Sequence, residues 1–181
     1  MRHILTLAAC LLLCAGLGAP EEHLRFNGIP LDGPVEAFTA SLEGFEVLGT
    51  NDVGMLLKGT LAGRPCTLLV KSLPGDGPVY AVDASFPIRN DWSLCKGDYV
   101  ALQKDFTVAY GRPKKIEKFD HPFREGDHCE LRHLNMGLCK WLSDFMTPEG
   151  SVSLRIQPVI VNNGQVVVSF EDKQNAALLN K

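Results

Sequence analysis

Apolar residues recur along this chain with two different periods, and the longer period predicts two helices. Val35, Phe38 and Leu42 are three or four positions apart, which is the spacing of one face of an α-helix. We expect Asp32 to cap this helix, because a short side-chain oxygen at that position accepts from the first backbone N–H groups. The same spacing predicts a second, longer helix over 91–110.

The shorter period, in which apolar and polar residues alternate, predicts strands separated by turns rich in Gly, Pro, Asn and Asp. Four strands are expected after the first helix and four after the second. Their ranges are 45–49, 53–61, 65–73 and 79–86, then 113–119, 137–146, 151–161 and 165–171. A short C-terminal helix is predicted over 172–179.

The two halves of this element order look like copies of one α-β4 unit. Their helices share apolar positions, which pair Val35 with Tyr99, Phe38 with Leu102 and Leu42 with Phe106. The pattern predicts a single α+β domain in 19–181, with two units at about 31–88 and 91–171 and an insertion at 120–136. We expect one antiparallel sheet with the helices packed on one face; two separate sheets are the alternative.

Strand alternation assigns side chains to the two faces of the predicted sheet. Leu154 is expected to face the helices, as are Tyr80 and Val82, while Arg155 faces the other way. The face away from the helices carries the candidate binding residues, which are Lys58, Lys71, Asp83, Lys140, Asp144 and Arg155. Such a mixed polar face either binds a protein or glycan partner or is simply solvated.

The insertion holds a cluster of side chains that are the right donors for zinc or copper. They are His121, His128 and His133, with Asp127, Cys129 and Glu130 between them. Their spacing is poor for a metal site. His128 and His133 are five positions apart, so they would point to opposite faces of a strand and would not share one face of a helix. We therefore interpret the insertion as a polar loop and predict no metal or other cofactor, with the three histidines as weak candidates.

Four cysteines follow residue 18: Cys66, Cys95, Cys129 and Cys139. An even number allows two disulfides in three pairings, and the alternative is that the thiols are small core residues. Both tryptophans, Trp92 and Trp141, are interpreted as packing residues.

Enzyme signatures are missing from the sequence. It contains no G-x-S-x-G, H-E-x-x-H or phosphate-binding glycine motif. Cys66 and Cys95 occupy core-facing positions, where a thiol is usually inert. Asp83 and Asp144 are conceivable as an acid–base pair across strands, but both have the spacing of the exposed face. A hydrolase of unrecognised class is the third and least favoured function.

The first residues have the pattern of a secretory signal peptide, with Arg2 before an apolar run and small residues after it. We predict a leader over 1–18 cleaved after Gly18, and hence a periplasmic or secreted protein. A lipidation motif ending at Cys10 is the less favoured alternative, because the apolar run continues beyond it.

The net charge of the full sequence is −3, and the leader removes one cation and no acid. This balance argues against a broadly basic nucleic-acid surface. No later segment is apolar for long enough to cross a membrane. The oligomeric state cannot be read from the sequence.

Three segments resemble a group of small exported proteins of unknown function from gut Bacteroidota. They are Phe26–Gly33, Phe86-Pro87 with Asp91–Ser93, and Tyr110–Pro113, together with Tyr99 and Leu102. The repeated plan is also similar in topology to β-lactamase-inhibitor-protein-like domains, in which a curved sheet presents one face to a partner protein. These likenesses rest on structural positions, and topology does not carry function.

Taken together, the sequence predicts an exported, non-enzymatic binding module with an unknown partner, a protein or glycan of the cell envelope. The alternative is an inhibitor-like protein that acts on a secreted enzyme through the open face of the sheet.

Overall fold

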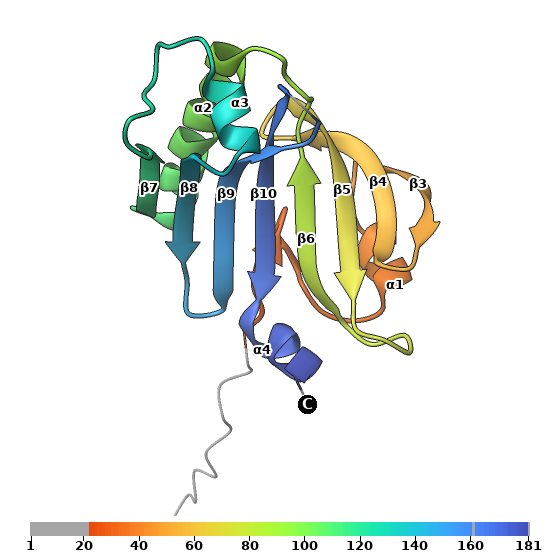
Figure 1. The fold of residues 1–181 in the computed structure, drawn as a ribbon. Coiled ribbons are helices and arrows are strands. Elements are labelled where there is room, and N and C mark those ends of the chain that lie inside the picture. Colours follow the sequence, from red (N-terminus) through yellow and green to blue (C-terminus); the bar gives the residue numbers. More distant parts are fainter. Residues whose placement is uncertain (1–21, 161, 181) are drawn as a thin grey trace, which may run out of the picture.

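The structure is a computed structural model that describes residues 22–160 and 162–180 (Figure 1). The expected leader over 1–18 lies outside the described residues, as do Gly18 and Cys10. In the part of the chain described, no helix is long and apolar enough to cross a membrane.

Within these residues, eight strands form one antiparallel sheet in the order β3-β4-β5-β6-β10-β9-β8-β7. Hairpins join β3 to β6 and β8 to β10, the insertion joins β7 to β8, and the two halves meet where β6 pairs with β10. The α+β class with an antiparallel sheet is therefore confirmed, and the alternative of two separate sheets is wrong. The strands are β3 (Glu46–Asn51), β4 (Gly54–Leu61), β5 (Arg64–Ser72), β6 (Val79–Ser85), β7 (Lys114–Phe119), β8 (Cys139–Met146), β9 (Gly150–Pro158) and β10 (Gly164–Asp172). A small hairpin of β1 (Arg25–Phe26) and β2 (Ile29–Pro30) precedes them.

Helix α2 (Trp92–Tyr110) packs against β8, β9 and β10. Asp91 caps it by accepting from the Leu94 N–H at 3.0 Å. Its apolar face buries Cys95, Tyr99 and Leu102 completely, as the helical spacing predicts.

Two short helices differ from expectation. Helix α1 (Val35–Ala40) begins after Pro34 without a side-chain cap, so the capping role expected for Asp32 is wrong. The insertion, expected to be a polar loop, contains helix α3 (Glu130–Asn135), which packs on β8 and β9 through Leu131 and Leu134. Helices α1, α2 and α3 all contribute buried side chains to one core cluster.

Side chains alternate between this core and the opposite side of the sheet, which we call the open face. On β9, Val152, Leu154 and Ile156 are buried, whereas Ser153 and Arg155 are only partly buried. This arrangement is what alternation with a period of two produces when one face is covered.

Tyr80 departs from the alternation. Lys71 pairs with Ala81 and Ser72 with Val79, which leaves Tyr80 as the extra residue of a β-bulge. Its side chain is partly buried and lines a hollow in the open face. The expectation that Tyr80 faces the helices is therefore wrong, because a bulge shifts the side-chain alternation by one position.

Both tryptophans pack in the core under α2. The Trp141 ring lies 5.5 Å from that of Trp92 and 5.8 Å from that of Tyr99, both nearly perpendicular. Trp92 and Trp141 are each 8% exposed. The interpretation of both as packing residues is confirmed.

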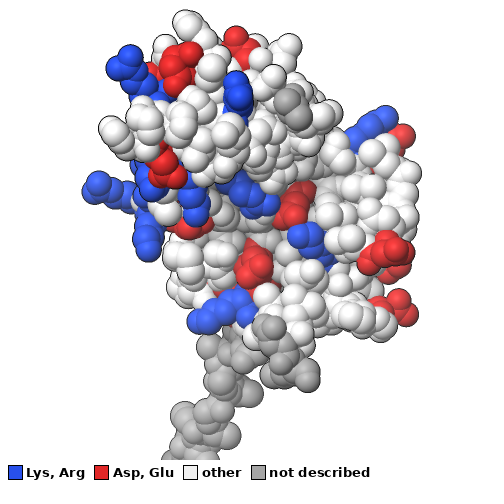
Figure 2. All heavy atoms as spheres, viewed as in Figure 1, with Lys and Arg blue, Asp and Glu red and all other residues white. Residues whose placement is uncertain are grey.

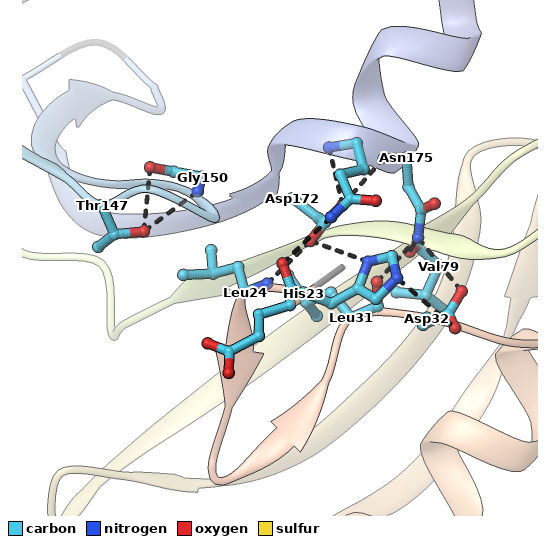
Figure 3. Close-up of polar contacts among 11 residues, drawn as sticks. His23, Leu24, Leu31, Asp32, Val79, Thr147, Gly150, Asp172 and Asn175 are labelled. Carbon is cyan, nitrogen blue, oxygen red and sulfur yellow. Dashed lines mark hydrogen bonds and ion pairs between the residues drawn. The ribbon is translucent and has the colours of Figure 1, made fainter. Parts of the chain in front are cut away.

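A buried carboxylate ties the N-terminal segment to the end of the sheet (Figure 3). Asp172, the last residue of β10, is fully buried and accepts from the Leu24 N–H at 2.8 Å. It also accepts from the backbone N–H groups of Gln174 and Asn175, at 3.0 and 2.9 Å, and so caps α4 (Lys173–Ala176). His23 Nδ1 lies 3.2 Å from the same carboxylate. One side chain thus satisfies donors from both ends of the described chain.

The neighbouring Asn175 continues this connection. Its side-chain amide donates to the Leu31 carbonyl at 2.9 Å and to the Val79 carbonyl at 3.0 Å. A 3₁₀ turn, η1 (Ala177–Asn180), follows and brings Leu179 to the edge of the open face. The C-terminal segment is therefore fixed beside β6.

Replacing Asp172 with Ala is expected to lower the free energy of unfolding by about 3 kcal/mol, because three backbone N–H groups lose their acceptor. Urea denaturation of the 19–181 chain, followed by circular dichroism, measures the change. Glu171→Ala is the matched control, since Glu171 is exposed; its loss should stay below about 0.5 kcal/mol. Equal losses in the two variants would contradict the structural role of Asp172.

Candidate functional site

The six candidate residues chosen from the sequence all lie on the open face. The register places Leu142, Arg155 and Val167 in one row across β8, β9 and β10. That row continues through Ser85 and Thr67 to Lys58. The next row runs from Asp144 through Ser153 and Ser169 to Asp83. None of the six is fully buried, so this face is available to a partner.

The structure joins these residues in small groups. Lys71 Nζ lies 2.6 Å from Asp83 Oδ2, with side chains 23% and 19% exposed. Ser153 donates its hydroxyl to Asp144 at 2.8 Å. Lys58 forms an exposed ion pair with Glu46 at 3.0 Å, and Lys140 is exposed and pairs in register with Lys118. The candidates therefore spread over the face and do not converge on one point.

A hollow of about 430 Å³ occupies the centre of the open face. Figure 2 shows positive and negative side chains next to each other in this region. The residues with polar side chains that line it are Lys71, Tyr80, Asp83, Ser151, Ser153, Arg155, Ser169 and Glu171. Of the six candidates, Lys71, Asp83 and Arg155 line the hollow, and Lys58, Lys140 and Asp144 do not.

Most lining residues were not among the six sequence candidates. Ser151, Ser153 and Ser169 alternate with buried residues of β9 and β10, so the rule that selected Arg155 could also have selected them. The sequence pattern did not indicate Tyr80 or Leu179. A β-bulge places Tyr80 at the hollow, and tertiary packing of the C-terminal segment places Leu179 there.

Arg155 is fixed in this hollow by neutral acceptors. Its Nη1 donates to Ser169 Oγ at 2.8 Å, and its Nε donates to Gln157 Oε1 at 3.3 Å. Among the described residues no carboxylate lies within ion-pair distance of its guanidinium. A partly buried guanidinium held only by neutral groups retains N–H donors for an incoming anion.

Asp83 and Asp144 are not placed as a carboxylate pair for hydrolysis. Asp83 and Asp144 lie in the same row with β9 and β10 between their strands. Three inter-strand spacings separate them by about 14 Å. Glycoside hydrolases need their two carboxyl groups about 5 to 9.5 Å apart. The acid–base pairing of Asp83 and Asp144 is therefore wrong.

The buried cysteines are poor nucleophiles. Burial raises the pKa of Cys66 to about 11 and the pKa of Cys95 and of Cys139 to about 12. Such thiols stay protonated at neutral pH, and only the thiolate is reactive. No disulfide joins the four cysteines in the described residues, and Cys129 alone among them is exposed.

The histidines of the insertion do not form a metal site. His133 is buried on α3 with its ring 4.5 Å from that of Phe123, and its Nδ1 lies 3.6 Å from Asp127 Oδ2. His121 and His128 are exposed. Over 22–160 and 162–180, no three His, Cys, Asp or Glu side chains are grouped so as to hold a metal ion.

A larger cavity of about 710 Å³ lies between the start of α2 and the insertion, but its acidic groups are already engaged. Glu125 accepts from Trp92 Nε1 at 2.9 Å and from Lys96 Nζ at 2.7 Å. The Lys96 hydrogen bond lowers the pKa of the Glu125 carboxyl. Glu130 accepts from the Gly126 N–H at 2.7 Å. These contacts hold the insertion on α2, so the open face is the better candidate site.

In the native 19–181 chain, Ellman's reagent at pH 8 should titrate one thiol quickly, Cys129, and the other three only after unfolding. Burial and raised pKa protect Cys66, Cys95 and Cys139. Cys129→Ser should abolish the fast reaction. Rapid reaction of two or more thiols would contradict the assignment, and a failure to recover four thiols in denaturant would reveal a disulfide.

No family model, curated protein or solved structure matches this chain. Its function is therefore inferred from the geometry of its own residues.

Proposed function

We propose that this protein is an exported, non-enzymatic binding module that holds a partner protein against the open face of its sheet. The observation that carries the proposal is that α1, α2 and α3 all bury side chains in the core on the other side, so in the described part of the chain none of these helices covers the open face. Partly buried Leu56, Leu69 and Leu142 lie on the open face beside polar groups. Apolar residues interspersed with fixed polar groups are typical of protein interfaces.

The non-enzymatic part of the proposal follows from where the chemically perturbed groups lie. The thiols with raised pKa are in the core, and Asp83 in the hollow is neutralised by Lys71 at 2.6 Å. Catalysis needs a nucleophile or base in contact with an accessible site. The hollow supports binding better than hydrolysis.

A protein partner is favoured over a glycan by the position of the tryptophans. Trp92 and Trp141 both pack under α2, on the side of the sheet away from the open face. A glycan platform presents such rings outward, where the apolar faces of sugars can stack on them.

The shape of the open face also makes the inhibitor-like alternative the less favoured of the two binding functions. A hollow receives a side chain, whereas an inhibitor that fills an enzyme cleft needs a projecting element.

We also propose that the two halves are copies of one α-β4 unit. The order of elements supports this, because α1 precedes β3 to β6 and α2 precedes β7 to β10, with α3 between β7 and β8. Export rests on the predicted leader. Removing 1–18 would leave the bond from Leu24 to Asp172 intact.

Glutamate substitutions on the open face are expected to abolish partner capture without unfolding the protein. Leu142→Glu and Thr67→Glu each place a negative charge on this face, and Thr67 is exposed. Val108→Glu is the matched control, because Val108 is 84% exposed on α2. The immobilised 19–181 chain would be incubated with cell-envelope extract and the captured proteins quantified by mass spectrometry, with circular dichroism checking each fold. Equal capture by all variants would exclude the open face as the interface.

Protein recovered from the periplasm or the medium of the producing cells should begin at Ala19. Intact-mass and N-terminal peptide measurements decide this. An uncleaved chain, or a lipid attached to Cys10, would contradict the proposed leader.

A further inference from the structure

Positive charge is concentrated on one half of the open face. Among the described residues, the open side of β7, β8 and β9 carries the cations Lys114, Lys118, Lys140 and Arg155 and the single anion Asp144. We call these four cations the basic strip. The whole sequence has a net charge of −3, so the strip is opposite in sign to the protein as a whole. Figure 2 shows the positive side chains gathered at the left, over β7 and β8.

Most of the basic strip has no internal counterion. Lys118 pairs with Asp120 at 2.9 Å. In the described part of the chain, Lys114, Lys140 and Arg155 have no carboxylate within ion-pair distance. Asp144 pairs in register with Lys114, but its Oδ1 accepts the Ser153 hydroxyl at 2.8 Å. Cations left without internal partners on a partly enclosed face attract an external anion.

Arg155 is the member of the strip that is partly buried in the hollow. Its bonds to Ser169 and Gln157 fix the guanidinium before any ligand arrives. The hydroxyls of Ser151 and Ser169 line the same hollow and can donate, whereas the Ser153 hydroxyl already donates to Asp144. An entering carboxylate would find a planar charged donor and further hydroxyl donors, which is the recognition that arginine provides better than lysine.

The hollow contains two cations, Lys71 and Arg155, and two carboxylates, Asp83 and Glu171. Lys71 pairs with Asp83, whereas Glu171 is exposed and has no cation within ion-pair distance among the described residues. Glu171 lies on β10, four residues along the strand from the Val167 that pairs with Arg155. It lines the hollow without forming an ion pair with Arg155, whose guanidinium is left for an external carboxylate.

We propose that an acidic segment of the partner protein lies along the basic strip and places one Asp or Glu carboxylate against Arg155. This inference rests on the proposed function and specifies the chemistry of the partner. The charge complementarity of the strip selects an acidic segment, and a hollow of about 430 Å³ accommodates a side chain. Lys114 and Lys140 then contact flanking carboxylates near the surface, where salt screens them more than it screens Arg155.

Fluorescently labelled poly-L-glutamate is the probe for this site, with binding to the 19–181 chain measured by fluorescence anisotropy. Arg155→Gln should weaken binding about tenfold, because a partly buried charge pair is lost. Arg155→Lys keeps the charge but loses the planar donor set, so its affinity for poly-L-glutamate should fall between those of the wild type and Arg155→Gln. Arg64→Gln is the matched control, because it removes the same charge from an Arg that pairs with Asp105 on α2. Its affinity should equal that of the wild type.

Two results would overturn the inference. The first is that the wild type and Arg155→Gln bind poly-L-glutamate with the same affinity, or that the wild type does not bind it at all. The other is binding of polygalacturonate in preference to poly-L-glutamate, lost in Arg155→Gln, which would assign the site to an acidic glycan. The proposed function is tested separately by partner capture, and it fails if Leu142→Glu and Thr67→Glu leave that capture unchanged.

Discussion

The pairing of β6 with β10 is the interaction on which the rest of this molecule depends. Five residue pairs, from Val167 with Ser85 to Glu171 with Ala81, join the two halves into one sheet. On the covered side this junction places Val82 beside Phe170 in the core. On the open side it places Asp83 beside Ser169, and the central hollow draws its lining from β5 and β6 on one half and β9 and β10 on the other. The same pairing that closes the core therefore creates the candidate site.

How far the sequence predicts this structure depends on the range of the interactions involved. The burial of Val152, Leu154 and Ile156 follows from alternation within a single strand, and it was predictable for that reason. Tyr80 was not, because the bulge exists only in the pairing of β6 with β5. The same holds for Leu179, whose position depends on Asp172 and Asn175 fixing the C-terminal segment.

The prediction of a polar loop over 120–136 was wrong for a different reason, since this segment contains α3. Leu131 and Leu134 are three positions apart and both are buried, so a helical signal was present in the insertion. The neighbouring histidines, whose spacing fits neither one face of a helix nor one face of a strand, led to the prediction of a polar loop. One of them, His133, is a buried packing residue against Phe123. The presence of metal-donor side chains therefore did not identify a metal site, whereas the spacing of the leucines in the same segment did indicate the helix.

The groups whose pKa is raised by burial lie away from the open face. Burial raises the pKa of Tyr99 as it does that of Cys95, and both lie on the buried face of α2. A raised pKa points to a functional site when the group is accessible, and these two groups belong to the core. On the open face, by contrast, Arg155 and Lys71 are held in place by neighbours on adjacent strands. Side chains already fixed lose little conformational entropy when a partner docks, so this arrangement favours recognition by a rigid surface.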